Sequence, residues 1–245
     1  MKDTIKNLVL SIVPGSIKKA ILHPVQMRHE QLLKDKLAFG QIAYSQEGED
    51  ILLNRIFNFK PQGTYVDIGA HHPRRFSNTY FFYKMGWSGI NIDAMPGSME
   101  AFKTDRPGDI NLELGIGLER GRLHFHIFKE PALNTFDEMQ ARKNQEAGWE
   151  LAEVREVEVY PLAELLEKHL NGREIDFMSI DVEGFEINIL RSNDWNRFRP
   201  SFLLLEDLNF SIHTVGQNSL MEFLQGVGYD FYGKLANTLF FKKIR

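Results

Sequence analysis

The chain of 245 residues contains no cysteine. This absence excludes disulfide bonds, thiolate nucleophiles and cysteine-ligated zinc. It is compatible with the cytoplasm, which is where we expect the protein to act. Any active-site chemistry must therefore come from other side chains.

The chain also lacks a long apolar run and an excess of positive charge. Without a stretch of about 18 apolar residues, no transmembrane helix is expected. Lysine and arginine number 29 against 33 aspartates and glutamates, a net charge of −4. Enzymes acting on nucleic acid usually carry a basic excess or stripe. We therefore expect no nucleic-acid partner.

The remaining composition is that of an ordinary globular protein, with 43% hydrophobic, 12% aromatic and 25% charged residues. The length fits one α/β domain with an appendage. We divide the chain into an N-terminal helical extension, residues 1–40, and an α/β domain, residues 41–245.

The extension has apolar residues at helical spacing, interrupted by Pro14-Gly15 and accompanied by lysines. One interpretation is a helix that packs on the domain. The other is an interfacial helix on an anionic membrane, which would hold the protein at the inner face of that membrane. Leu8 to Val13 is also apolar like the centre of a signal peptide. No small-residue cleavage site follows, so we expect the segment to be retained.

From Thr64 onward, apolar runs of strand length alternate with helical patterns. Strands are predicted at residues 65–68, 89–92, 111–114, 123–128, 175–180, 202–205, 229–232 and 239–243. Helices are predicted at residues 77–85, 97–104, 162–170, 184–191 and 217–225. This alternation predicts a doubly wound, mostly parallel sheet. The last two strands flank a turn with glycine and asparagine, which predicts an antiparallel hairpin.

Acidic and small residues follow several predicted strands. In an open α/β sheet, ligands bind beyond the carboxyl ends of the strands. The features at such ends are Asp67-Ile68-Gly69-Ala70, Asp93, the turn at Gly115, Asp181-Val182-Glu183-Gly184, and Glu206. Gly69 and Ala70 let a ligand approach the backbone, and Asp93 can accept hydrogen bonds from both hydroxyls of a ribose. These features predict a nucleoside site.

The loop after the first of these strands distinguishes two ligand classes. A dinucleotide site needs G-x-G-x-x-G so that a helix N-terminus can hold the pyrophosphate. Here the loop is Gly69-Ala70-His71-His72-Pro73, with a single glycine. The preceding Asp67 would repel a pyrophosphate but suits a ligand with a sulfonium and an amino group. The pattern favours a methyl donor over NAD.

The sequence resembles the FkbM family of methyltransferases over residues 44–243. The matching stretches are Tyr44-Ser45-Gln46-Glu47-Gly48-Glu49-Asp50, Val66-Asp67-Ile68-Gly69-Ala70-His71-His72-Pro73, Ser77-Asn78-Thr79, Ile92-Asp93-Ala94-Met95-Pro96 and Ile180-Asp181-Val182-Glu183-Gly184-Phe185-Glu186. The resemblance implies a class I methyltransferase fold, which is Rossmann-like with seven strands, S-adenosylmethionine as donor, and O-methylation of sugars or natural products. Two departures are the missing G-x-G-x-G loop and an aspartate at position 93, where glutamate is common.

The resemblance also assigns cofactor-binding residues. Asp67, Gly69, Ala70 and His71 would face the methionine part of S-adenosylmethionine. Asp93 with Ala94 would face the ribose, and Gly115 the adenine. Gln46 and Glu49 would close over the cofactor, although they could equally cap the start of a helix. Asp67 and Gly69 could instead serve only the turn, and Asp93 could be a solvated strand end.

Methylation of a hydroxyl requires a base near the acceptor oxygen. Asp181 and Glu183 are the first candidates, followed by His213 and then His71 or His72. Asp181 could instead only hydrogen-bond a neighbouring loop, and His213 could be an ordinary loop histidine.

A metal is a further option at the same strand ends. Asp181 and Glu206 could hold Mg²⁺, with Asp207 or Asn209 completing an oxygen shell. We do not favour it, because paired acids at strand ends are common without a metal.

The sequence thus predicts an S-adenosylmethionine-dependent O-methyltransferase that acts on a sugar hydroxyl of a surface polysaccharide or other glycan. One alternative acceptor is a small secondary metabolite. Another reading is a non-catalytic module that binds S-adenosylmethionine, and a nucleotide-sugar or NAD enzyme comes last.

Overall fold

The computed structural model describes residues 27–28, 40–207, 210–211, 213 and 219–244. The chain divides into two units, Met1–Ile42 and Ala43–Arg245, and the fold below is that of the second. Apart from residues 27, 28 and 40, the predicted extension and its membrane contact lie outside the described residues. Within the described part, no helix combines the length and the apolar character needed to cross a membrane.

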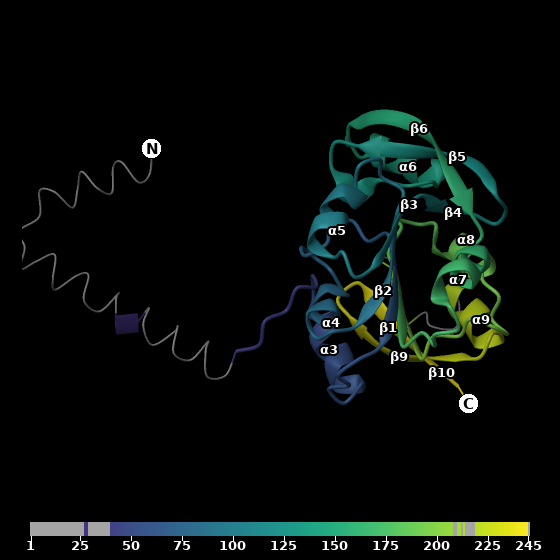
Figure 1. Cartoon of the computed structure of the whole chain (residues 1–245). Coiled ribbons are helices and arrows are strands. Elements are labelled where there is room, and N and C mark those ends of the chain that lie inside the picture. The colour runs from purple at the N-terminus through teal and green to yellow at the C-terminus, as the bar shows by residue number, and fades with distance from the viewer. Residues whose placement is uncertain (1–26, 29–39, 208–209, 212, 214–218, 245) are drawn as a thin grey trace, which may run out of the picture. The chain divides into compact units, whose positions relative to one another are not determined.

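A seven-stranded sheet forms the centre of the domain (Figure 1). Its order is β3-β2-β1-β7-β8-β10-β9, and β10 runs antiparallel to the other six strands. The strands are β1 (Thr64–Ile68), β2 (Ser88–Asp93), β3 (Ile110–Glu113), β7 (Phe177–Ile180), β8 (Phe202–Glu206), β9 (Tyr229–Leu235) and β10 (Thr238–Lys243). This confirms the predicted class I methyltransferase fold with its C-terminal antiparallel hairpin.

Strand β1 lies at the point where the strand order reverses. It pairs in parallel with β2 on one side and with β7 on the other. The chain leaves β1 toward β2 and later returns to β7, so the loops after β1 and β7 diverge. Ligands of open α/β sheets bind at such a switch point.

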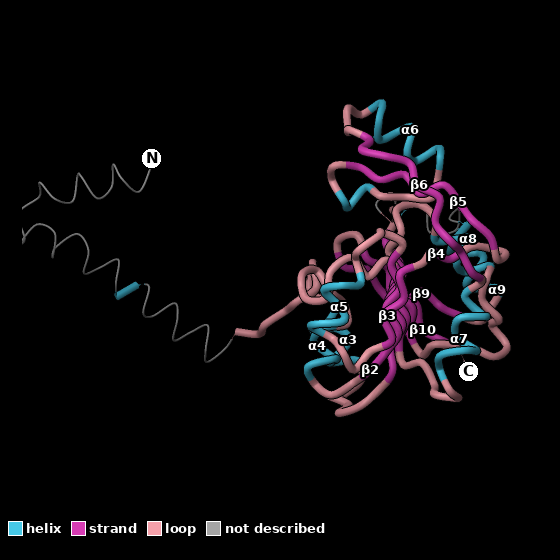
Figure 2. The backbone as a smooth tube through the Cα atoms, turned by 45° about the horizontal axis from the view of Figure 1, so that its top comes forward, coloured by secondary structure: helices cyan, strands magenta, loops and turns pink. Residues whose placement is uncertain are grey.

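Helices cover both faces of the sheet (Figures 1 and 2). The helices of one face are α3 (Glu49–Ile56), α4 (Tyr80–Lys84) and α5 (Met99–Asp105). The helices of the other are α7 (Leu162–Leu170), α8 (Glu186–Arg191) and α9 (Ser219–Gly226). The strands are buried on both faces: Val66 and Ile68 join the cluster with α7, α8 and α9, whereas Tyr65 joins the cluster with α3 and α4. Burial on both sides explains why the strands read as continuous apolar runs.

An insert between β3 and α7 forms a second, three-stranded sheet of order β4-β6-β5. It consists of β4 (Gly115–Ile116), β5 (Gly121–Phe128), the 3-10 turn η1 (Pro131–Leu133), α6 (Glu138–Glu146) and β6 (Leu151–Tyr160). Figures 1 and 2 place it beyond the carboxyl ends of the main strands. The sequence predicted only one of its strands, at residues 123–128. The insert lies on the side of the sheet where ligands bind.

Helix boundaries follow the local backbone. α7 begins and ends where predicted. α4 begins only at Tyr80: Thr79 is its N-cap without a side-chain cap, and the Ser77 hydroxyl accepts the backbone N–H of Tyr80 at 3.1 Å in the turn before it. α8 begins only at Glu186, since Glu183 and Gly184 have positive φ angles of 52° and 98°. Helix α6, which is almost entirely polar, was not predicted, and α3 was anticipated only as a helix start near Gln46 and Glu49.

Gly69 is the glycine on which the fold depends most. Its φ is +79°, and a Cβ there would collide with the carbonyl oxygen of Asp181. We expect Gly69→Ala to lower the free energy of unfolding by about 3 kcal/mol, the upper end of the usual range for overpacking. Gly97→Ala is the matched control, since Gly97 has φ +84° and open space around it. It should cost only the backbone term, about 1–2 kcal/mol. Equal losses in urea denaturation would show that the collision is relieved.

Candidate functional site

Four acidic side chains share one face of the sheet at its carboxyl end. Asp67 pairs with Asn91 on β2 and with Ser179 on β7. Asp93 lies two residues after Asn91, and Asp181 lies two residues after Ser179. Side chains alternate between faces along a strand, so both carboxylates point to the same face as Asp67. Ser179 pairs with Leu204, which places Glu206 on this face as well. The predicted strand-end residues are thus brought together on the face covered by α3, α4 and α5.

Hydrogen bonds join the loop after β1 to the end of β2. The backbone N–H groups of Gly69 and Ala70 donate to the Ile92 carbonyl at 2.9 and 3.1 Å. The Asp93 carboxylate accepts the N–H of His71 at Oδ2 and of Met95 at Oδ1, both at 2.8 Å. Burial raises the pKa of Asp93, and the two backbone donors oppose that rise. Each oxygen keeps a second lone pair, so the fixed carboxylate suits the two hydroxyls of a ribose.

Asp67 belongs to a buried polar network under this loop. Its Oδ2 accepts the Thr79 hydroxyl at 2.7 Å, and Thr79 Oγ1 in turn accepts Arg106 Nη1 at 2.9 Å. Arg106 is fully buried, and its Nε pairs with Asp109 at 2.8 Å. Burial raises the pKa of Asp67, whereas Thr79 and Arg106 lower it. The structure therefore gives Asp67 a structural role, since its carboxylate is hydrogen-bonded beneath the loop after β1.

The other predicted cofactor residues divide into packed and exposed ones. Ala70 is buried against α5, Ala94 packs on the insert, and His71 is exposed with φ 51°. Gly115 has a packing reason of its own, since a Cβ there would lie 2.6 Å from the ring of Phe136. The ligand contacts assigned to these residues stay predictions.

His72 stabilises the backbone of the same loop through hydrogen bonds. Its Nδ1 accepts the backbone N–H groups of Arg74 and Arg75, both at 3.0 Å. Partial burial and the neighbouring His71 lower the pKa of His72. The imidazole is thus a neutral acceptor that shapes the turn.

The segment before α3 lies near the end of β8. Glu49 is buried; its Oε1 accepts the Thr238 hydroxyl at 2.7 Å and its Oε2 accepts the Glu47 N–H at 2.9 Å. Thr238 pairs with Glu206, so Glu49 lies near the end of β8. Gln46 is exposed.

Three carboxyl groups converge beyond β7 and β8. Asp181, Glu183 and Glu206 each offer an oxygen within 4.8 Å of the other two. Asp181 is exposed, and the other two are half-buried. Desolvation by the surrounding protein and repulsion from Glu206 and Glu183 raise the pKa of Asp181 well above its usual range. Desolvation also raises the pKa of Glu206, and the hydrogen bond between Asp181 and Glu206 raises the pKa of Asp181 further while it opposes the rise at Glu206.

Glu183 is the third carboxyl of this group with a raised pKa. Desolvation, with repulsion from Glu206 and Glu186, raises the pKa of Glu183 to about 8. A carboxyl with a pKa near the working pH is suited to accept a proton during a reaction. The predicted first candidates, Asp181 and Glu183, thus lie together.

The same oxygens could hold a divalent cation. Mg²⁺ takes one or two carboxylates and keeps several waters. Asp207 follows Glu206 directly, whereas Asn209 lies outside the described residues. Because ligands must be deprotonated, the raised pKa values of Asp181 and Glu206 oppose binding of a cation.

His213 lies in the loop after β8. Its side chain is exposed, and its backbone N–H donates to the Ser211 hydroxyl at 3.3 Å. Much of this loop lies outside the described residues, so its role as a base stays a prediction.

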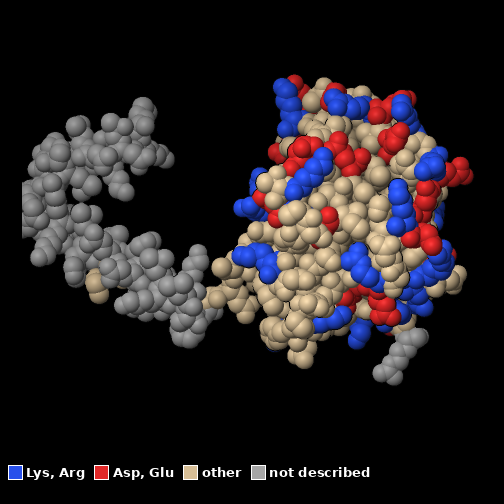
Figure 3. Space-filling model, viewed as in Figure 1, with Lys and Arg blue, Asp and Glu red and all other residues tan. Residues whose placement is uncertain are grey.

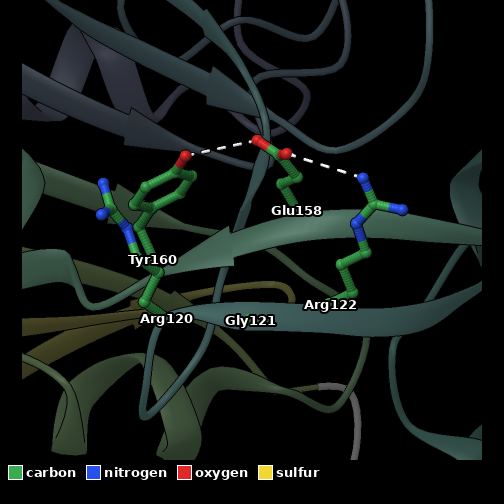
Figure 4. A pocket seen from close by; sticks show the side chains of 5 residues that line it. All are labelled: Arg120, Gly121, Arg122, Glu158 and Tyr160. Carbon is green, nitrogen blue, oxygen red and sulfur yellow. Dashed lines mark hydrogen bonds and ion pairs between the residues drawn. The ribbon is translucent and has the colours of Figure 1, made fainter.

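A recess of about 420 Å³ lies away from these residues, on the sheet of the insert (Figure 4). Glu158 accepts the Tyr160 hydroxyl at 3.2 Å and pairs with Arg122 at 3.8 Å. Arg120 lies over the Tyr160 ring at 4.7 Å and pairs with Glu164 at 3.2 Å. Both arginines have acidic partners, so we do not assign this recess a ligand.

On the face shown in Figure 3, lysine and arginine side chains are interspersed with aspartate and glutamate. This distribution offers no broad basic surface on that face of the described domain. It agrees with the expectation from net charge, and the lack of a nucleic-acid partner stays a prediction.

Sequence reasoning gave no role to several residues of the site. Asn78 Nδ2 donates to Ser179 Oγ at 3.0 Å, next to Asp67. Thr79 donates its hydroxyl to Asp67 and itself accepts a hydrogen bond from Arg106. The motif Ser77-Asn78-Thr79 was a usable signal for two of them. Arg106 follows a helix in an unremarkable polar segment, so only the fold identifies it.

Comparison with known proteins is consistent with this geometry. The model of a family described as "Methyltransferase FkbM domain" matches residues 67–231. No curated protein matches the sequence. Two solved structures that the chain resembles are a TehB-like SAM-dependent methyltransferase from Corynebacterium glutamicum and a precorrin-6y C5,15-methyltransferase from Geobacter metallireducens.

The first of these is 12% identical, with 90% of this chain and 99% of that chain covered and a TM-score of 0.39. The second is 10% identical, with 79% and 87% covered and a TM-score of 0.37. The match over residues 67–231 is the finding that assigns the family.

Proposed function

The chain belongs to the FkbM methyltransferase family, and we propose that it methylates a sugar hydroxyl of a surface polysaccharide or related glycan. Family membership makes it a methyltransferase that uses S-adenosylmethionine. The observation that supports a hydroxyl acceptor is the convergence of Asp181, Glu183 and Glu206 within 4.8 Å of one another. Carboxyl oxygens are strong acceptors for hydroxyl groups.

The residues at the switch point fit the cofactor. Asp93 keeps lone pairs for two hydroxyls, and the loop of residues 69–73 has no glycine-rich cradle for a pyrophosphate. Asp93 would hold the ribose, and the backbone of Gly69 and Ala70 would face the methionine part. When bound, S-adenosylmethionine supplies an electrophilic methyl group on a positively charged sulfur.

The chain's own residues would then orient the acceptor and remove its proton. Most of the acceleration of a displacement comes from alignment of the reacting groups. We assign hydrogen bonding of the acceptor hydroxyls to the Asp181–Glu206 pair. Glu183, in its ionised form, would take the proton that the acceptor oxygen loses.

The test is transfer of isotope-labelled methyl groups to a panel of acceptors. The panel contains neutral oligosaccharides, nucleotide-linked sugars, small hydroxylated metabolites and an amine. We expect label in an O-methyl sugar, identified by mass spectrometry after hydrolysis, and none with Asp181→Asn. Label only in a small metabolite, or in the amine, would overturn the sugar assignment. Binding of S-adenosylhomocysteine without transfer to any acceptor would indicate a non-catalytic module.

We further propose that the reaction needs no metal, because the raised pKa of Asp181 beside Glu206 opposes the deprotonation that a metal ligand requires. Turnover should therefore be unchanged after treatment with EDTA and dialysis. Activity that is lost in EDTA and restored by Mg²⁺ would instead identify Asp181 and Glu206 as metal ligands.

The cytoplasmic location and the membrane contact of residues 1–40 are also part of the proposal. Co-sedimentation of the full chain with anionic liposomes, compared with residues 41–245, tests the contact. Equal sedimentation of the two would count against it.

A further inference from the structure

One loop of the insert touches the backbone that carries Glu183. The loop, residues 134–137, lies between η1 and α6. The Thr135 hydroxyl donates to the carbonyl oxygen of Glu183 at 2.9 Å. Next to this bond, the ring centroids of Phe136 and Phe185 are 5.7 Å apart. A polar and an apolar contact thus join the insert to the loop after β7.

Thr135 is itself held in place. Its side chain is 1% exposed, and its backbone exchanges two hydrogen bonds with His126, at 2.9 and 3.1 Å. The hydroxyl oxygen accepts the backbone N–H of Asp137 at 2.9 Å. A hydroxyl has one proton to donate, and here that proton goes to Glu183. The direction of this hydrogen bond is therefore fixed.

Glu183 has a backbone conformation that needs support. Its φ of 52° lies in the left-handed region, which costs a residue other than glycine of order 1–3 kcal/mol. The following N–H, that of Gly184, donates to the Glu186 carboxylate at 3.1 Å. Thr135 and Glu186 thus hold the two polar groups of a single peptide, the one joining Glu183 to Gly184. The orientation of this peptide directs the side chain of Glu183.

We propose that Thr135 is a positioning residue that aims the Glu183 carboxyl at Asp181 and Glu206. The proposal rests on the proposed function, in which Glu183 receives the acceptor proton. Thr135 touches neither substrate nor cofactor and acts through the Glu183 carbonyl. Because the loop that carries Thr135 belongs to the insert, this role of Thr135 would make the insert contribute to the geometry of the acceptor site.

Two variants separate the hydroxyl from the shape of the side chain. Thr135→Val keeps the volume and loses the hydrogen bond, whereas Thr135→Ser keeps the hydroxyl. We expect the valine variant to lower kcat about 10- to 100-fold, the cost of misplacing a group by about 1 Å. Its KM for S-adenosylmethionine and its affinity for S-adenosylhomocysteine should not change. The serine variant should stay within about threefold of wild type.

The matched control is Thr104→Val in α5. The Thr104 hydroxyl also donates to a backbone carbonyl, that of Glu100 at 3.4 Å, and its side chain is exposed. This variant should keep wild-type kcat. A valine variant at position 135 with wild-type kcat would overturn the proposal. Equal losses in the valine and serine variants, or a parallel loss of S-adenosylhomocysteine affinity, would show a merely structural role and overturn it too.

A second readout does not depend on turnover. Amide hydrogen exchange reports local opening of the backbone, and Thr135→Val should speed exchange in the peptide that covers residues 181–187. Thr135→Ser should not. If wild type transfers methyl groups to no acceptor, the proposed function fails, while this exchange still measures the link. Unchanged exchange in the valine variant would reject the link whatever the activity.

Discussion

Replacing Glu183 by glutamine is expected to lower kcat by about 10²- to 10⁴-fold, the usual contribution of a general base. It should also abolish a rise of kcat/KM with pH. Desolvation and repulsion from Glu206 raise the pKa of Glu183 to about 8. Below that pH the carboxyl is protonated and cannot accept a proton; above it the carboxylate can. In wild type, kcat/KM should therefore increase through about pH 8, measured with labelled donor at fixed ionic strength.

The histidine candidate makes a different prediction. A base at His213 would leave Glu183→Gln active, whereas His213→Ala would lose its activity. We expect the reverse: His213→Ala should keep both the activity and the alkaline rise of wild type. Activity that persists in Glu183→Gln and vanishes in His213→Ala would move the base to His213.

Replacing Arg106 by methionine should cost about 3–5 kcal/mol of unfolding free energy, the range seen when one partner of a buried ion pair is removed. The side chains of Arg106 and Asp109 are both 0% exposed and lie 2.8 Å apart. Arg106 Nη2 also donates to the Tyr65 hydroxyl at 2.8 Å. The variant would leave the Asp109 charge buried without its cationic partner, and would remove one donor from the network that includes Asp67. Urea denaturation followed by circular dichroism measures the loss.

Arg142→Met is the control for this prediction. Arg142 pairs with Glu138 one turn away in α6, and both side chains are about two-thirds exposed. Exposed pairs contribute about 0–1 kcal/mol, so the control should remain within about 1 kcal/mol of wild type. Similar losses in the two variants would mean that burial does not determine the strength of the Arg106 pair.

The main sheet could be predicted because its strands are short apolar runs that end in acids or small residues. Ile175 to Ile180 and Phe202 to Leu205 are buried on both faces, so their composition alone identifies them. The insert could not be predicted in the same way. β6 is largely exposed and α6 is almost entirely polar, so neither carries a clear apolar period.

For the site, the sequence predicted which residue types are present and at which strand ends they lie. Asp93 and Asp181 lie at strand ends that the sequence identifies. Local sequence patterns do not reveal contacts between residues that are far apart in the chain. Examples are the hydrogen bonds of Thr135 with Glu183 and of Glu49 with Thr238. These bonds depend on the placement of whole elements. The raised pKa of Glu183 has the same origin, because it comes from desolvation by the surrounding protein and from the nearby Glu206 of another strand.

The measurement that tests the central claim most directly is calorimetric titration of the full chain with S-adenosylhomocysteine, for wild type and Asp93→Ala. Hydrogen bonds to a charged acceptor contribute about 1.5–3 kcal/mol each, so two ribose hydroxyls at Asp93 should account for at least a hundredfold in affinity. We predict micromolar binding by wild type and no measurable binding by Asp93→Ala, with the variant shown to be folded by circular dichroism at the titration temperature. Folded wild-type protein that does not bind, or a variant that binds as wild type does, would contradict a cofactor site at Asp93.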